Sequence, residues 1–206
     1  MAGVHMSRFL LVRHGKTKLH QDDRFWGSTD VPLSDEGIEQ AERISRRLAV
    51  EKITAVYTST LSRARLTGEI IASRHRLEVE AVGELCECNF GYIEGLTFKE
   101  INEKYPELAE ELGRGDTMAF PGGENVSQLD GRVRAFMERL QEVKPEATVA
   151  IVSHGGPLRL LVCRLLGIGT EHWQQLRIDH ASLSIVETFP TMAILNLLND
   201  VSHLKP

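Results

Sequence analysis

The chain has 206 residues, of which 42% are apolar, and this is enough for one large domain with its own core. Its net charge of −5 at neutral pH argues against broad binding to nucleic acids or anionic membranes, because both require a basic surface. The three cysteines form no C-x-x-C pair, which indicates a reducing, cytoplasmic compartment and neither a disulfide framework nor a metal site. No apolar run is long enough to span a bilayer. We expect a single domain over residues 1–206.

The first predicted element is a buried strand over residues 9–12, which ends in Arg13, His14 and Gly15. Open α/β folds bind their ligands at the carboxyl ends of such strands. A neutral, well-oriented histidine can act as a nucleophile, and an arginine beside it can hold an anion through a two-pronged contact. A polar loop over residues 16–31 follows.

Helices and strands then alternate along the chain. Ser34 is a suitable N-cap for a helix, whose apolar face repeats at helical spacing through Ile38, Ala41, Ile44 and Leu48. A strand over residues 55–59 and a helix that ends near Ile71 come next. Residues 77–81 alternate between apolar and charged side chains, which predicts a strand with one solvated face. The alternation of strands and helices predicts an α/β sandwich of three layers.

The pattern is irregular from residue 83 to residue 123. Thr97 and Glu100 have the spacing of a capping box and predict a short helix, and acidic residues are frequent after it. An irregular segment of this length is usually a lid or a binding loop, and we expect a lid at about 83–123. Three carboxylates at its root are candidates for a catalytic acid: Glu84, Glu87 and Glu94.

A second buried strand, over residues 148–152, ends in Ser-His-Gly at residues 153–155. A helix follows, and Pro157 suits its first position, so the amino end of this helix opens beside His154 and favours an anion. Because two distant strands each deliver one histidine, we expect a single site. The other late elements are an amphipathic helix over residues 126–140 and a hairpin of two strands over residues 182–188 and 193–199.

Five segments, in this order, resemble the motifs of the histidine phosphatase superfamily, whose best-known members are the phosphoglycerate mutases. They are residues 13–15, 27–34, 58–64, 85–96 and 153–155. The resemblance covers most of the chain and implies a three-layer α/β/α sandwich with a mostly parallel central sheet. It also selects Glu87 among the three carboxylates, because the family spacing Leu-x-Glu-x-x-Phe-Gly fits residues 85–91.

The resemblance implies phosphoryl transfer without a metal or an organic cofactor. His14 would attack phosphorus, with its other ring nitrogen held by a backbone carbonyl, and Glu87 would protonate the leaving group. The phosphate would be bound by four further residues, Arg13, Arg63, His154 and Gly155. His20 stands where the family commonly has asparagine and Trp26 where it has glutamine, and both are candidate substrate contacts. The remaining histidines, His75, His172, His180 and His203, are expected to be structural or solvated.

Three functions are left open. We favour a phosphatase of small organic monoesters, either α-ribazole 5′-phosphate or a broad range, because the middle segment is shorter and less basic than in the mutases. A cofactor-dependent phosphoglycerate mutase is the alternative, and a non-catalytic phosphate-binding module would lack one of the motif residues. The expected partner is a small phosphate ester, and a homodimer is left open. Four aromatic residues could line the leaving-group side of the site: Trp26, Phe90, Tyr92 and Phe98. If they do so in place of cations, we expect a preference for aryl or nucleoside-like esters over 3-phosphoglycerate.

Overall fold

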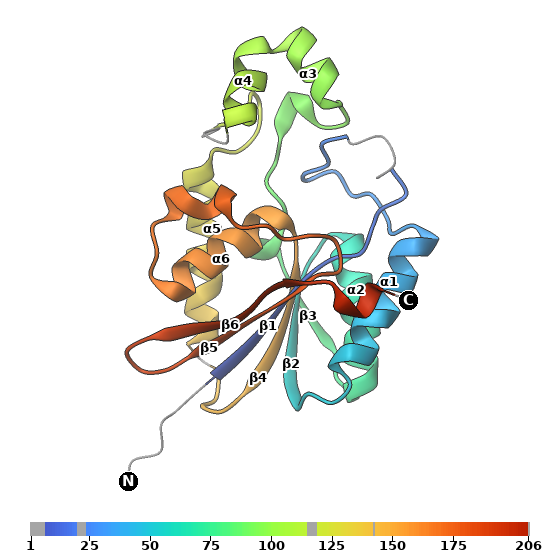
Figure 1. Cartoon of the computed structure of the whole chain (residues 1–206), viewed down its shortest axis with the longest axis vertical. Helices are drawn as coiled ribbons and strands as arrows, with labels where there is room; N and C mark the ends of the chain where they lie inside the picture. The colour runs from blue at the N-terminus through green and yellow to red at the C-terminus, as the bar shows by residue number, and fades with distance from the viewer. Residues whose placement is uncertain (1–6, 20–23, 115–118, 142, 206) are drawn as a thin grey trace.

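The computed structural model describes residues 7–19, 24–114, 119–141 and 143–205. Its strands form one six-stranded sheet in the order β3-β2-β4-β1-β5-β6 (Figure 1). The parallel strands are β1 (Ser7–Arg13), β2 (Ile53–Ser59), β3 (Val79–Val82) and β4 (Thr148–Ser153). At one edge, β5 (Leu183–Thr188) pairs antiparallel with β1, and β6 (Ala193–Asp200) pairs antiparallel with β5. The predicted mostly parallel sheet is confirmed.

Helices cover both faces of the sheet. One face carries α1 (Asp35–Leu48) and α2 (Ser62–His75), and the other carries α5 (Val126–Leu140) and α6 (Gly155–Leu166) (Figure 1). In β1, Leu10 and Val12 are buried in the cluster with α1 and α2, whereas Phe9 and Leu11 are buried in the cluster with α5 and α6. Because both faces of β1 are covered, its sequence is a continuous apolar run. The predicted three-layer sandwich is confirmed.

The amino end of α1 packs directly against the chain that follows β1. Ser34 caps α1, as predicted, by accepting a hydrogen bond from the amide of Gly37. The Ser34 amide donates to the carbonyl of Lys16 at 3.0 Å, and the Lys16 amide donates to Gln40 Oε1 at 2.9 Å. Gly37 lies so close that a Cβ there would overlap the Lys16 carbonyl oxygen. The helix therefore holds in place the residues just after His14.

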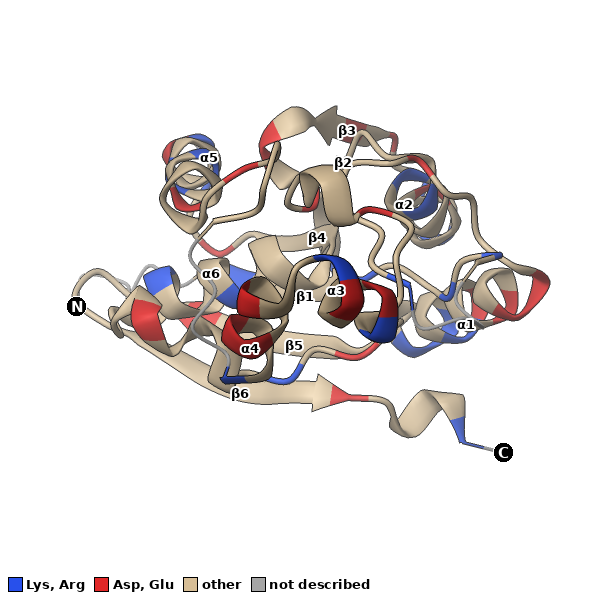
Figure 2. Ribbon diagram, turned by 90° about the horizontal axis from the view of Figure 1, so that it is seen from above, with Lys and Arg blue, Asp and Glu red and all other residues tan. Residues whose placement is uncertain are grey.

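The segment from residue 83 to residue 114 extends beyond the carboxyl ends of the parallel strands (Figure 1). It contains η2 (Gly83–Leu85), η3 (Gly91–Ile93), α3 (Phe98–Lys104) and α4 (Pro106–Arg114). The capping box of Thr97 and Glu100 is present at α3. Seen from above, α3 and α4 lie over the sheet and carry acidic residues (Figure 2). That this segment acts as a lid stays a prediction.

Several predicted boundaries are wrong. Helix α2 continues past Ile71 to His75. Strand β3 is shorter than predicted, and because it is an edge strand, Ala81 is exposed instead of turned inward. The sequence patterns also did not indicate α4 or two short helices, η4 (Thr170–Gln175) and η5 (Ser202–Leu204). None of the helices in the described ranges is both long and apolar enough to cross a membrane.

We expect Gly37→Ala to lower the free energy of unfolding by about 1–3 kcal/mol, the usual cost of overpacking, because the added methyl group would separate α1 from Lys16. Gly131→Ala in α5 is the matched control, since a Cβ there meets nothing within 4 Å and alanine is the better helix former by about 0.8–1 kcal/mol. Urea denaturation of both variants tests this. Unchanged stability of Gly37→Ala would contradict the close packing.

Candidate active site

The pairing of β1 with β4 brings two histidines together. The strands are parallel and Arg13 lies opposite Ser153, so the next residue of each strand leaves the sheet at the same place. The amide of His14 donates to the Ser153 carbonyl at 3.0 Å. The ring centroids of His14 and His154 are 4.9 Å apart. The two histidines predicted to share a site are therefore neighbours.

The amino end of α6 lies at the same place. His154 is the N-cap of α6, which begins at Gly155. The prediction that Pro157 is the first residue of this helix is wrong, because it is the third. Proline is tolerated there because the first four amides of a helix have no acceptor within the helix. These unpaired amides and the helix dipole favour an anion at this end.

His14 is held in one tautomer and in its neutral form. Its Nδ1 lies 2.7 Å from the carbonyl oxygen of Gly15. Because a carbonyl oxygen only accepts hydrogen bonds, Nδ1 carries the proton and Nε2 keeps its lone pair. Burial lowers the pKa of His14 well below its ordinary value, and the neighbouring histidines and arginines lower it further. Burial thus contributes more to the low pKa of His14 than the neighbouring charges do.

Two arginines supply positive charge beside His14. Arg13 donates through Nη1 to the carbonyl of Ile178 at 2.7 Å, while its Nε is buried without a hydrogen-bond partner in the described part of the chain. Arg63, in the first turn of α2, donates to the carbonyls of Thr29 at 2.8 Å and Gly27 at 2.6 Å. Burial lowers the pKa of Arg13 to about 10 and also lowers that of Arg63. Arg13 is therefore cationic at neutral pH.

Of the three candidate carboxylates, Glu87 is the one that borders the site. Its carboxylate accepts hydrogen bonds from the backbone amide of Cys88 at 2.9 Å and from the backbone amide of Gly156 at 3.2 Å. Glu84 instead pairs with Arg139 on α5. The third carboxylate, Glu94, accepts hydrogen bonds from the backbone and hydroxyl groups of residues 28 and 29.

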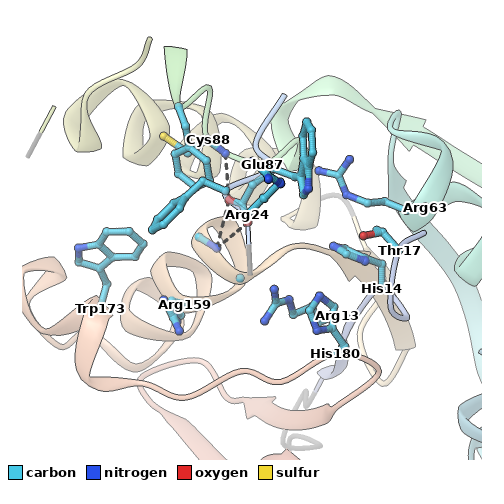
Figure 3. Close-up of a pocket in the computed structure, with 15 residues that line it drawn as sticks. Arg13, His14, Thr17, Arg24, Arg63, Glu87, Cys88, Arg159, Trp173 and His180 are labelled. Carbon is cyan, nitrogen blue, oxygen red and sulfur yellow. Dashed lines mark hydrogen bonds between the residues drawn. The ribbon is translucent and has the colours of Figure 1, made fainter. Parts of the chain in front are cut away.

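A cavity of about 340 Å³ is bordered by Arg13, His14, Arg63 and Glu87 (Figure 3). His154 is fully buried beside His14 and is not among the bordering residues, and both of its ring nitrogens lack a hydrogen-bond partner within the described ranges. Burial, followed by the charges of the two arginines, lowers its pKa well below the ordinary value. His20 lies outside the described residues. The predicted residues that border the cavity are Arg13, His14, Trp26, Arg63, Glu87 and Gly155.

His180, which we expected to be structural or solvated, lies beside His14, a position that the sequence did not indicate. Its ring centroid lies 5.2 Å from that of His14, and it borders the cavity. His180 comes shortly before β5, which is antiparallel to β1, so the beginning of β5 lies at the carboxyl end of β1. Only the strand pairing reveals this proximity. Other bordering residues that the sequence did not single out are Thr17, Arg24, Phe25, Arg159 and Trp173.

The leaving-group side of the cavity differs from the expectation. Trp26 and Phe90 border it, but Tyr92 and Phe98 do not; they are 69% and 47% exposed. In addition, two arginines that the sequence did not single out are present there. Aromatic side chains therefore border the cavity together with cations, and the preference for aryl esters stays a prediction.

The cavity combines an anion-binding environment with a neutral nucleophile. Cationic side chains and the amino end of α6 border it, together with the carboxylate of Glu87. Within the described ranges, no three histidine, cysteine, aspartate or glutamate side chains are placed to hold a metal ion. This charge distribution suits an anionic ligand, and Nε2 of His14 keeps an unprotonated lone pair beside it.

Comparison with known proteins identifies the family. The family profile of the histidine phosphatase superfamily, branch 1, matches residues 9–201. The chain is 31% identical to phosphoserine phosphatase 1 of Hydrogenobacter thermophilus, over 97% of this chain and 95% of that protein. It is 35% identical to a bifunctional protein of Mycobacterium tuberculosis over 96% of its own length, but it spans only 55% of that longer protein.

A solved structure shows the same architecture. The α-ribazole phosphatase of Shigella flexneri superimposes on this chain with a TM-score of 0.85 and 31% identity, covering 94% of this chain and 96% of that one. The predicted resemblance and fold class are therefore confirmed.

Stability should fall as the pH is lowered below the ordinary histidine pKa. The folded-state pKa values of His14 and His154 lie below those of the unfolded chain, so the unfolded chain binds more protons in this range and is favoured. Each histidine contributes up to about 1.4 kcal/mol per pH unit below about pH 6.5. Urea denaturation at pH 7.5 and 5.5 measures the change.

His154→Gln should reduce this pH dependence, because glutamine does not titrate. His172→Gln is the control, since His172 is exposed, and it should leave the pH dependence as in the wild type. A wild-type stability that is flat between pH 6.5 and 5.5 would contradict the assignment of two neutral buried histidines.

Proposed function

The chain belongs to the histidine phosphatase superfamily, and from this premise we propose that it hydrolyses small organic phosphate monoesters through a phosphohistidine intermediate on His14. The observation that carries the proposal is the state of His14: its Nδ1–H is bound by the Gly15 carbonyl, and its pKa is low enough to leave Nε2 unprotonated. A nucleophile of this kind beside buried arginines suits an anionic phosphorus centre.

Binding of the phosphate group would use buried donors that have no partner in the described part of the chain. Arg13 Nε and both ring nitrogens of His154 are buried and unpartnered within the described ranges, and neutral His154 can donate from one of them. Arg63 adds positive charge, and its bonds to the carbonyls of Thr29 and Gly27 hold its guanidinium in place. Gly155 contributes the amino end of α6.

The reaction would proceed in two displacements. Nε2 of His14 attacks phosphorus, the bond from phosphorus to the ester oxygen breaks, and protonated Glu87 donates its proton to the leaving oxygen. Glu87 then takes a proton from water, whose oxygen attacks phosphorus, and the bond to Nε2 breaks to release phosphate. Neutral His14 is restored at the end, and no cofactor takes part in either displacement.

Hydrolysis is favoured over phosphoglycerate mutase activity. A mutase must return the phosphoryl group to a bound sugar acid and retain phosphohistidine against water. The segment over the cavity is acidic here: α3 and α4 carry five glutamates, at positions 100, 103, 107, 110 and 111. A non-catalytic module is disfavoured because Arg13, His14, Arg63 and Glu87 all border one cavity. The three free cysteines support a cytoplasmic location.

Rapid alkaline quenching during turnover of a labelled ester should trap phosphate on His14. His14→Ala should lose at least about 1,000-fold in kcat/KM, because it removes the nucleophile. His172→Ala is the control, since this histidine is exposed, and it should keep the activity and the labelled intermediate. Near-normal turnover by His14→Ala would exclude the proposed mechanism.

Glu87→Gln should separate substrates by their leaving groups. For alkyl phosphates kcat/KM should fall roughly 100- to 10,000-fold, the contribution of a general acid, whereas p-nitrophenyl phosphate should lose much less because p-nitrophenolate leaves without a proton. Glu84→Gln, whose carboxylate pairs with Arg139 away from the cavity, should change neither. Equal losses for the two ester classes would mean that Glu87 is not the acid.

A further inference from the structure

A turn over residues 178–182 contacts both His14 and the arginine that precedes it. The amide of Ala181 donates to the His14 carbonyl at 3.0 Å. The carbonyl of Ile178, at the beginning of the turn, accepts a hydrogen bond from Nη1 of Arg13 at 2.7 Å. The backbone of the nucleophile is therefore held in part by this turn.

Ala181 has a conformation that is unusual for alanine. Its φ is 53°, in the left-handed region, where the Cβ of residues other than glycine comes too close to the backbone. Ala181 is fully buried. A conformation of this kind persists only where the surrounding structure maintains it. Further contacts are therefore required to keep the Ala181 amide on the His14 carbonyl.

His203, in η5, provides such a contact. Its Nε2 lies 2.9 Å from the carbonyl oxygen of Ala181, and because this oxygen only accepts, Nε2 carries the proton and donates. Its Nδ1 is buried and has no hydrogen-bond partner among the described residues. The bond to Ala181 is therefore the only hydrogen bond of the ring within the described ranges.

The segment that carries His203 connects α1 to the 178–182 turn. Figure 1 shows η5 beside α1, and Nη1 of Arg43 on α1 donates to the Leu204 carbonyl at 3.2 Å. Asn199, just before η5, binds the first half of the turn. Its Oδ1 accepts from the Asp179 amide at 2.6 Å, and its Nδ2 donates to Asp179 Oδ2 at 2.9 Å.

We propose, on the basis of the proposed phosphatase function, that His203 is a positioning residue for the nucleophile and acts through Ala181 on the backbone of His14. His203 does not border the cavity, so it does not touch the substrate. The His14 ring is bound to its own backbone, since Nδ1 donates to the carbonyl of Gly15. A shift of the His14 backbone would therefore move Nε2 away from phosphorus.

Anion binding depends on other contacts. Arg13 is bound to the beginning of the turn, which Asn199 holds through Asp179. Arg63 is bound to a different loop. Loss of the His203 bond should therefore slow the chemical step and leave the affinity for phosphate unchanged.

His203→Met removes the donor and keeps a large side chain. In rapid-quench experiments with a labelled ester, this variant should form phosphohistidine on His14 roughly 10- to 100-fold more slowly, since misplacing a reacting group by about 1 Å has an effect of this size. Calorimetry should give the wild-type affinity for inorganic phosphate. Equal losses of affinity and of labelling rate would overturn the proposal, because His203 would then support the site as a whole.

The conservative variant His203→Gln keeps an N–H group for the Ala181 carbonyl and should restore most of the labelling rate. His75→Met is the matched control, because His75 is also half-buried and lies at the end of α2 that is remote from Arg63; it should label at the wild-type rate. Equal losses in His203→Met and His203→Gln would overturn the proposal, since the packing of the ring, and not its hydrogen bond, would then matter.

Amide hydrogen exchange tests the link to His14 without turnover. The Ala181 amide should exchange roughly 3- to 10-fold faster in His203→Met, the effect of one lost hydrogen bond, whereas the amides of β1 should keep their protection. If the wild-type protein hydrolyses no ester but this exchange still rises, the phosphatase function fails and the link from His203 to His14 stands. Labelling of His14 with unchanged Ala181 exchange would support the phosphatase and overturn the role of His203.

Discussion

The site depends first on the register between β1 and β4. Arg13 pairs with Ser153 across the two parallel strands. This pairing places His14 and His154 side by side at the carboxyl ends of the strands. A shift of one residue would turn every side chain of one strand to the other face of the sheet. It would move Leu10 and Val12 out of the cluster beneath α1 and α2. The same apolar packing that stabilises the fold therefore sets the geometry of the histidines.

Desolvation then decides the charge states in the site. His14 and His154 are neutral because their burial disfavours the protonated form, whereas the guanidinium groups, with a much higher intrinsic pKa, stay charged despite the same effect. Arg13 and Arg63 keep their charge among backbone carbonyl dipoles of two separate loops. The site thus holds positive charge in fixed positions where little water can rearrange. Charges fixed in this way stabilise a bound anion more strongly than they would in water.

Residues outside the cavity hold its loops in position. Arg132 on α5 donates to the carbonyls of Glu84 and Cys86 and pairs with Glu124, which supports the turn that carries Glu87. Glu94 binds residues 28 and 29, and the carbonyl of Thr29 in turn accepts from Arg63. Glu94, a candidate for the acid from the sequence alone, thus helps to hold the segment that fixes the guanidinium of Arg63.

The sequence by itself determined the strands, most helices, the sandwich and the motif residues, because apolar periodicity and capping depend on residues close together in the chain. It could not place His180, since that required knowing that β5 pairs antiparallel with β1. Nor could it show that Arg24 and Arg159 border one cavity, or that Arg24 pairs with Glu100. The partners of a charged side chain lie far away in sequence, and only the tertiary structure decides which of them come within reach.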